Sequence, residues 1–193
     1  MEAGSLIIMR SFIAIEIPDD IKKELIEAQS RLKSSGVEAS WPRPEGIHLT
    51  LKFLGEVPET GILKIMEGLR QSVAGTAPFR LNVEGIGACP GPKNARVAWI
   101  GLSGDTETLK RLQAAIENAM GRLGMEHEER AFKPHLTLGR IKYIRSRDRW
   151  LKALEEMRDI KLSGFDITSI SLMKSELKPS GAVYTELGRV ELK

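Results

Sequence analysis

The same alternation of apolar and polar residues occurs at two places in the chain, residues 48–51 and 135–138, which both read His-Leu-Thr-Leu. Successive side chains of a β-strand point to opposite faces, so this pattern predicts two strands whose leucines face a core. The histidine and the threonine of each strand then share the other face. Each predicted strand therefore displays one imidazole and one hydroxyl group.

Around the first motif, the spacing of apolar residues predicts further strands and two helices. An amphipathic helix is expected to begin after Pro18 and to end at Gly36, and a second helix is expected over residues 59–73. The predicted strands are 12–17, 48–54 and 79–86. Glycine and proline residues predict a turn at 55–58 and a loop at 85–93.

From Arg96 onward the pattern starts again, with a predicted strand at 96–102, a helix at 105–123 and the second motif strand. Phe12 precedes His48 by 48 − 12 = 36 positions, and Val97 precedes His135 by 135 − 97 = 38. We interpret this as an internal pseudo-repeat whose second copy starts near residue 96. The elements predicted after the second motif are a helix at 147–157, strands at 161–165, 167–174 and 183–190, and a hairpin-like turn at 179–181.

The first half of the chain thus offers three short strands and the second half five, each with two helices, which favours an α+β fold. We expect two lobes, each a mostly antiparallel sheet with helices on its outer face, with the two sheets facing a central cleft that holds both motifs. The alternative is one continuous mixed sheet with the motif strands apart. We predict a single bilobal domain over residues 9–193, preceded by an N-terminal extension of residues 1–8.

Composition narrows the class of protein. A chain of 193 residues with 41% hydrophobic and 28% charged residues is typical of a globular protein with one substantial domain or two fused lobes. The single cysteine, Cys89, cannot form an internal disulfide, so we expect a reducing compartment and a cytoplasmic location. The apolar stretch at 6–9 is too short for a signal peptide, and no segment approaches a membrane span. A net charge of +3 is compatible with an anionic substrate but identifies none.

The repetition of the motif indicates a two-histidine site. Ordinary residue frequencies would place Leu-Thr-Leu after a given histidine only about once in two thousand cases. A lone histidine on a strand is more often a hydrogen-bonded, half-buried side chain, but two of the three histidines here carry the same phrase. Two imidazoles that titrate near neutrality can act as acid and base in one turnover, and threonine hydroxyls can donate to an anionic oxygen. This combination suits phosphoester cleavage. The third histidine, His127, is given no role.

The phrases HLTLKFLGEV and FKPHLTLGRI resemble the paired motifs of the two-histidine phosphoesterase superfamily. Within that superfamily the chain is most similar to the RNA 2′,3′-cyclic phosphodiesterases, formerly called 2′-5′ RNA ligases. The resemblance extends from RSFIAIEIP at Arg10, through CPGPKNARVAWIGL at Cys89, to SELKPSGAVYTEL at Ser175. The chain departs from the family pattern at Cys89, where an aromatic residue is expected, and in residues 1–8. The resemblance implies the bilobal duplicated fold.

The resemblance also implies roles for individual residues. It assigns His48 as proton donor and His135 as proton acceptor, although the two motifs are symmetric in sequence and leave the direction open. Thr50 and Thr137 would bind the non-bridging phosphoryl oxygens, but threonine also suits strands through its β-propensity. Arg140 matches a basic residue of the family, five positions after the second histidine, that would pair with the phosphate. Strict alternation would put Arg140 on the wrong face, and a β-bulge at the neighbouring glycine could redirect it.

The implied reaction opens terminal 2′,3′-cyclic phosphates of RNA, with tRNA fragments as one candidate, and leaves a 2′-phosphate. A 2′-5′ RNA ligase using the same site, and a non-catalytic RNA-end binder, are the alternatives. No metal site is predicted, because no cysteine pair or acidic cluster accompanies a motif, and no phosphate-binding glycine loop occurs. We expect no cofactor, no membrane partner and a monomer.

Two further groups of residues could contact RNA. Residues 142–149 carry a basic run that could contact the RNA backbone, although such runs are more often solvated surface. Phe12, Trp41 and Phe53 could stack on a terminal base, but packing in the core is the commoner role for each.

Overall fold

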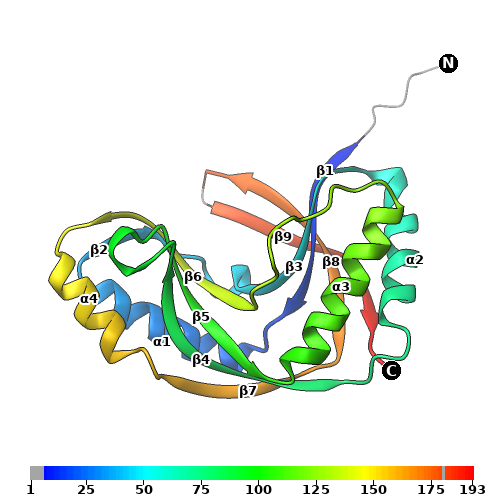
Figure 1. The fold of residues 1–193 in the computed structure, drawn as a ribbon. Helices are drawn as coiled ribbons and strands as arrows, with labels where there is room; N and C mark the ends of the chain where they lie inside the picture. Colours follow the sequence, from blue (N-terminus) through cyan, green and yellow to red (C-terminus); the bar gives the residue numbers. More distant parts are fainter. Residues whose placement is uncertain (1–6, 180) are drawn as a thin grey trace.

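Two antiparallel sheets make up the centre of the computed structural model, which describes residues 7–179 and 181–193 (Figure 1). The four-stranded sheet has the order β3 (His48–Pro58), β1 (Ile8–Glu16), β8 (Ser169–Lys178) and β9 (Gly181–Glu191). The five-stranded sheet has the order β2 (Val37–Ser40), β6 (His135–Ile144), β5 (Val97–Gly104), β4 (Phe79–Cys89) and β7 (Lys161–Ile167). The two sheets confirm the predicted α+β class, and the alternative of one continuous sheet is wrong.

Helices flank the two sheets on their outer sides (Figure 1). They are α1 (Asp19–Ser34), α2 (Ile62–Val73), α3 (Thr106–Arg122) and α4 (Arg147–Glu156), with short 3-10 turns at Pro44–Gly46, Glu59–Gly61 and Pro92–Asn94. Helices α2 and α3 pack on each other and against the four-stranded sheet, through β9 and β3 respectively. Helix α1 contacts β2, β6 and β7 of the five-stranded sheet, and α4 lies beside α1. No helix among the described residues is long and apolar enough to span a membrane.

Each lobe draws on both halves of the chain, which differs from our expectation that each half would build its own lobe. Strands β2 and β4 come from the first half but lie in the five-stranded sheet, and β8 and β9 come from the second half but lie in the four-stranded sheet. The core does not divide at the middle of the chain either, since most buried apolar residues form one continuous cluster spanning both lobes. An amphipathic pattern shows which side of an element is apolar, but not which sheet that side will meet.

Several predicted boundaries are wrong because glycine can form a bulge as well as a turn. The turn expected at 55–58 is instead part of β3, which continues to Pro58 along β1 and has Gly55 at a φ of 70° beside a register shift. The loop expected at 85–93 begins later, because β4 continues to Cys89 past a second shift at Gly85, whose φ is 74°. Strand β2 was not predicted, since four residues carry too little pattern.

Two expectations fall partly outside the described residues. Residues 1–6 of the expected N-terminal extension lie outside the described residues. Ile8 of the same extension is already part of β1, where it pairs with Pro58 of β3. Ser180 of the expected hairpin turn also lies outside, while the residues on either side join β8 to β9 through the pair Lys178 and Gly181.

Candidate active site

The two motif strands contact each other where the sheets meet, β3 from one sheet and β6 from the other (Figure 1). The four motif leucines are almost completely buried, as the alternation predicts: Leu49, Leu51, Leu136 and Leu138. The side chains of both threonines and of His48 are only partly exposed, and His135 is exposed. The leucines anchor each strand in the core, so the polar pair of each motif is displayed on the face that the core does not use.

Both motif strands contain the same β-bulge. In the pairing of β3 with β1, Leu51 has no partner residue. In the pairing of β6 with β5, Leu138 has none. In each motif the extra residue is therefore the leucine directly after the threonine. A one-residue bulge reverses the alternation of faces beyond it. The position five residues after each histidine consequently returns to the face that the histidine occupies.

This bulge brings Arg140 to the face of the second motif. Arg140 pairs with Val97, Thr137 with Trp99 and His135 with Gly101, and those three residues of β5 alternate regularly on one face. The bulge anticipated beside Gly139 is thus present, with the neighbouring leucine as the extra residue. The role of Arg140 in binding phosphate remains a proposal.

Residue 139 must be a glycine, because the ring of Trp41 occupies the space that its side chain would fill on the opposite face of the sheet. A Cβ atom at this position would lie 2.7 Å from the Trp41 ring, which packs against the core side of β6. The ammonium group of Lys33 lies 5.3 Å from the centre of the same ring. Trp41 is therefore a packing residue on the helix-covered side and not a base-stacking candidate.

Aromatic rings surround His48. Its ring centre lies 4.7 Å from that of Phe12 and 5.0 Å from that of Tyr184, which meets it edge-on. Phe12 is buried in a small apolar cluster of its own, whereas Phe53, 6.2 Å from Phe12, is 64% exposed. Of the stacking candidates, Phe53 alone presents most of its ring to solvent. Tyr184 could not be found from the sequence, because it reaches the site from the distant strand β9.

The environment of His48 disfavours its charged form. Burial lowers the pKa of His48 to about 4, partly opposed by a hydrogen bond to the Gly46 backbone and reinforced by the positive charge of Lys22. The imidazole is therefore neutral at pH 7 in the free protein. As a neutral group it can accept a proton from water without first losing one.

His135 is oriented by the loop that leads into its strand. Its Nδ1 lies 2.7 Å from the carbonyl oxygen of Lys133. Because a carbonyl oxygen can only accept, Nδ1 carries the hydrogen and Nε2 is left to exchange a proton with a substrate. His48 makes the equivalent contact in the first motif, with the backbone of Gly46. In both motifs the backbone partner lies two residues before the histidine.

Trp99 borders His135 and was not proposed from the sequence. The two ring centres are 6.5 Å apart, and the indole lies so close over Gly87 that a Cβ there would be 2.3 Å from it. Strand parity could have found this residue, because Trp99 alternates with the buried Ala98 and Ile100 and must face the other side.

The basic run after the second motif divides into two parts. Arg145 is paired with Glu38 of β2, while Lys142, Arg147 and Arg149 are exposed and have no such acidic partner among the described residues.

No group of three or more histidine, cysteine or acidic side chains in residues 7–179 and 181–193 is arranged to hold a metal ion.

Comparisons with known proteins agree on one family. The family model described as LigT like Phosphoesterase matches residues 15–99 and again 100–184. An RNA 2′,3′-cyclic phosphodiesterase of Thermotoga maritima is 36% identical over 179 residues, covering 93% of both chains. Another, of Methanothermobacter thermautotrophicus, is 32% identical over 93% of this chain and 96% of its own.

Solved structures show the same fold. The protein TT0787 of Thermus thermophilus superimposes with a TM-score of 0.80 at 28% identity, covering 95% of this chain and 98% of its own. Escherichia coli LigT in complex with 3′-AMP has a TM-score of 0.77 at 22% identity, with 96% and 99% covered.

Proposed function

The chain belongs to the LigT-like phosphoesterase family, and on that premise we propose that it hydrolyses the 2′,3′-cyclic phosphate at the end of an RNA to a 2′-phosphate. The observation that carries the proposal is the matched pair of motif strands, each displaying a histidine and a threonine ahead of the same bulge. Relatives named for this reaction, with more than nine-tenths of this chain aligned, support the choice of substrate.

In the proposed mechanism, His135 accepts a proton from the attacking water through Nε2 as the water oxygen bonds to phosphorus. His48 donates a proton to the departing 3′ oxygen, and the bond from phosphorus to that oxygen breaks. Each proton transfer contributes about 10² to 10⁴ in rate. The proton gained by His135 and the proton lost by His48 balance, so exchange with solvent restores both residues.

The remaining site residues stabilise the negative charge that gathers on phosphorus-bound oxygens. Thr50 and Thr137 donate hydrogen bonds to the non-bridging oxygens, and Arg140 supplies the positive charge. We also propose that the enzyme works without a metal or cofactor, as a monomer in the cytoplasm.

His48 needs the second proton of a charged imidazolium to act as donor, and in the free protein it lacks that proton at neutral pH because burial lowers its pKa to about 4. An anionic phosphodiester beside the ring raises the pKa of the imidazole, so proton uptake accompanies substrate binding. The neutral state of His48 also favours a second assignment, in which His48 is the base and His135 the acid. NMR titration of the two imidazoles in the complex with 3′-AMP distinguishes the two assignments: a charged His48 at neutral pH supports His48 as donor, and a neutral His48 beside a charged His135 supports the reverse.

The proposed function is tested by incubating the protein, in the presence of EDTA, with an oligoribonucleotide that ends in a 2′,3′-cyclic phosphate. We expect turnover to a 2′-phosphate, identified by phosphorus NMR. A 3′-phosphate product would mean that the substrate lies reversed and that the histidine roles are exchanged. Loss of all activity on chelation would overturn the metal-free mechanism. Addition of a 5′-hydroxyl oligonucleotide tests the ligase alternative, which predicts a 2′-5′-joined product, and binding with no turnover would support the RNA-end binder.

A further inference from the structure

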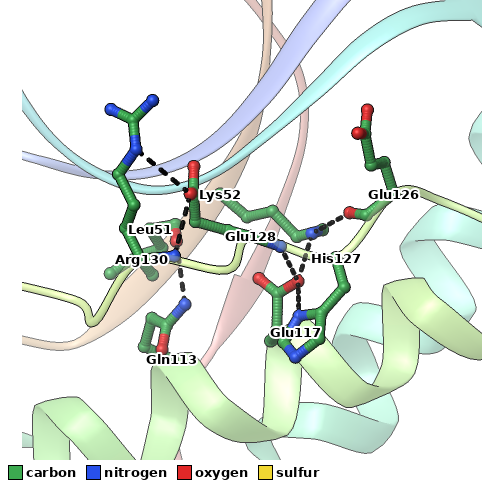
Figure 2. Close-up of polar contacts among 8 residues, drawn as sticks. All are labelled: Leu51, Lys52, Gln113, Glu117, Glu126, His127, Glu128 and Arg130. Carbon is green, nitrogen blue, oxygen red and sulfur yellow. Dashed lines mark hydrogen bonds and ion pairs between the residues drawn. The ribbon is translucent and has the colours of Figure 1, made fainter.

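A buried ionic network lies behind the first motif and belongs to no catalytic step (Figure 2). One carboxylate oxygen of Glu117 on α3, Oε1, is 2.5 Å from Lys52 Nζ and 2.8 Å from His127 Nδ1, and accepts from the Glu128 backbone N–H at 3.0 Å. The side chains of Lys52 and Glu117 are only 2% and 8% exposed. Their charges are therefore taken out of water to make these contacts.

The bulge in β3 explains why a lysine is buried here. Lys52 follows the extra leucine, and the reversed alternation turns it to the side of the sheet that α3 covers. Its Nζ donates to Glu117 and also, at 2.8 Å, to the carbonyl oxygen of Glu126. In the second motif strand the matching position is Gly139, so this lysine has no counterpart there.

The network holds the loop of residues 123–134, which runs from α3 to β6 (Figure 1). Three consecutive residues of this loop are fixed: the Glu126 carbonyl by Lys52, and the His127 ring and Glu128 N–H by Glu117. Seven residues further along, the loop delivers His135, after Lys133 has supplied the carbonyl that orients its ring (135 − 128 = 7). Thus the strand that carries the first histidine holds the loop that presents the second.

Stability alone does not account for this pair. Isolating two charges from water is costly, and replacing a buried ion pair with apolar residues of similar size is often neutral or stabilising. Burial raises the pKa of Glu117, but the hydrogen bonds from Lys52, His127 and the Glu128 N–H outweigh it and hold that pKa below its usual value, so the carboxylate is charged at neutral pH. Within the described part of the chain its second oxygen, Oε2, is buried without a hydrogen-bond partner. A well-filled apolar site would avoid these costs.

We infer that Glu117, paired with Lys52, is a positioning residue that sets the path of the 123–134 loop and hence the placement of His135 relative to His48. The inference rests on the proposed function for its effect on turnover, but not for its effect on the loop.

The decisive variant is the double substitution K52M/E117M, which fills the same space with unbranched apolar side chains and leaves no buried charge unpaired. We expect its melting temperature to match or exceed that of the wild type, because the costly charges are gone. We expect kcat on the cyclic-phosphate oligonucleotide to fall about tenfold or more with KM changed less than about twofold, since a misplaced catalytic group lowers turnover rather than binding.

A second readout requires no substrate. Trypsin cleavage after Arg130, inside the loop, should become at least several times faster in K52M/E117M than in the wild type, as measured by mass spectrometry under native conditions. The matched control is E107M/K110M, which removes an exposed ion pair from the same helix and should leave both kcat and cleavage at Arg130 unchanged. Wild-type kcat together with wild-type cleavage in K52M/E117M would overturn the inference.

A loss of kcat in step with a lower melting temperature would also overturn the inference, because it would indicate a purely structural pair. E117Q provides an independent check, measured at a temperature where circular dichroism shows that the variant is fully folded. Its kcat must fall as well. A folded E117Q with wild-type kcat and wild-type cleavage would contradict the inference. If the wild type shows no hydrolysis at all, only the proposed function fails, and the cleavage rates still decide the question of the loop.

Discussion

Phe53 and Arg140 occupy equivalent positions on the two motif strands. Each lies five residues after its histidine (48 + 5 and 135 + 5), and each follows a bulge at the same place. One lobe therefore presents an exposed aromatic ring where the other presents a guanidinium group. The two lobes share a backbone design but bring different chemistry to the face they display.

Replacement of Arg140 by Ala should weaken catalysis, because in the proposed mechanism the anionic phosphate then loses a charge-assisted hydrogen bond. We expect kcat/KM on a cyclic-phosphate oligonucleotide to fall by a factor that corresponds to about 1.5–3 kcal/mol of lost transition-state stabilisation. The control is Arg145→Ala, which removes an equally basic group that is paired with Glu38. Equal losses in both variants would show that general surface charge, and not the placement of Arg140, is responsible.

Substitution of either histidine of the proposed catalytic pair should abolish most turnover while sparing the fold. His48→Ala and His135→Ala are each expected to lower kcat by about 10² or more, since each removes one proton transfer. Circular dichroism and thermal melting check the folded state. A variant with kcat close to that of the wild type would exclude its histidine from the mechanism.

The threonines should contribute less than the histidines. Thr50→Val and Thr137→Val keep the size and the β-branching but delete the donor, so we expect losses of about 1–3 kcal/mol each in kcat/KM. Steady-state kinetics at saturating and limiting substrate gives these values. If both variants behave like the wild type, the threonines are present for strand propensity alone.

The buried state of His48 should make the protein less stable in mild acid. Its pKa is lowered from 6.5 to about 4 in the folded protein. Between these values the unfolded chain binds a proton at this residue and the native protein does not, so the free energy of unfolding falls as the pH drops through this window, by up to about 3 kcal/mol. Urea titrations at several pH values, compared with His48→Gln, measure the effect. The same slope in both proteins would assign the pH dependence to other groups.

Gly139 should not tolerate a side chain. Gly139→Ala would place a methyl group 2.7 Å from the Trp41 ring, and the resulting overpacking is expected to cost about 1–3 kcal/mol of stability. Gly121→Ala on α3, where a Cβ meets no atom within 4 Å, serves as the control and should not destabilise the protein. Chemical denaturation of both variants measures the difference.

Local patterns predicted the motif strands well because a strand encodes its two faces in adjacent residues. The burial of the motif leucines and the return of Arg140 to the histidine face both follow from alternation and from one glycine. The matching bulge at Leu51 was not predicted, since no glycine stands beside it. Tyr184 and the Glu117 network were missed for a different reason: their contacts join residues far apart in the chain, and no periodicity records them.

The exchange of strands between the lobes has a consequence for biosynthesis. In the four-stranded sheet β1, near the N-terminus, lies between β3 and β8, and β8 begins only at Ser169. A nascent chain that already carries both motifs still lacks the hairpin that closes this sheet, and with it the Tyr184 ring against His48. Synthesis must therefore pass Tyr184 before the first histidine acquires its final surroundings, and neither half of the chain supplies all the strands of either sheet.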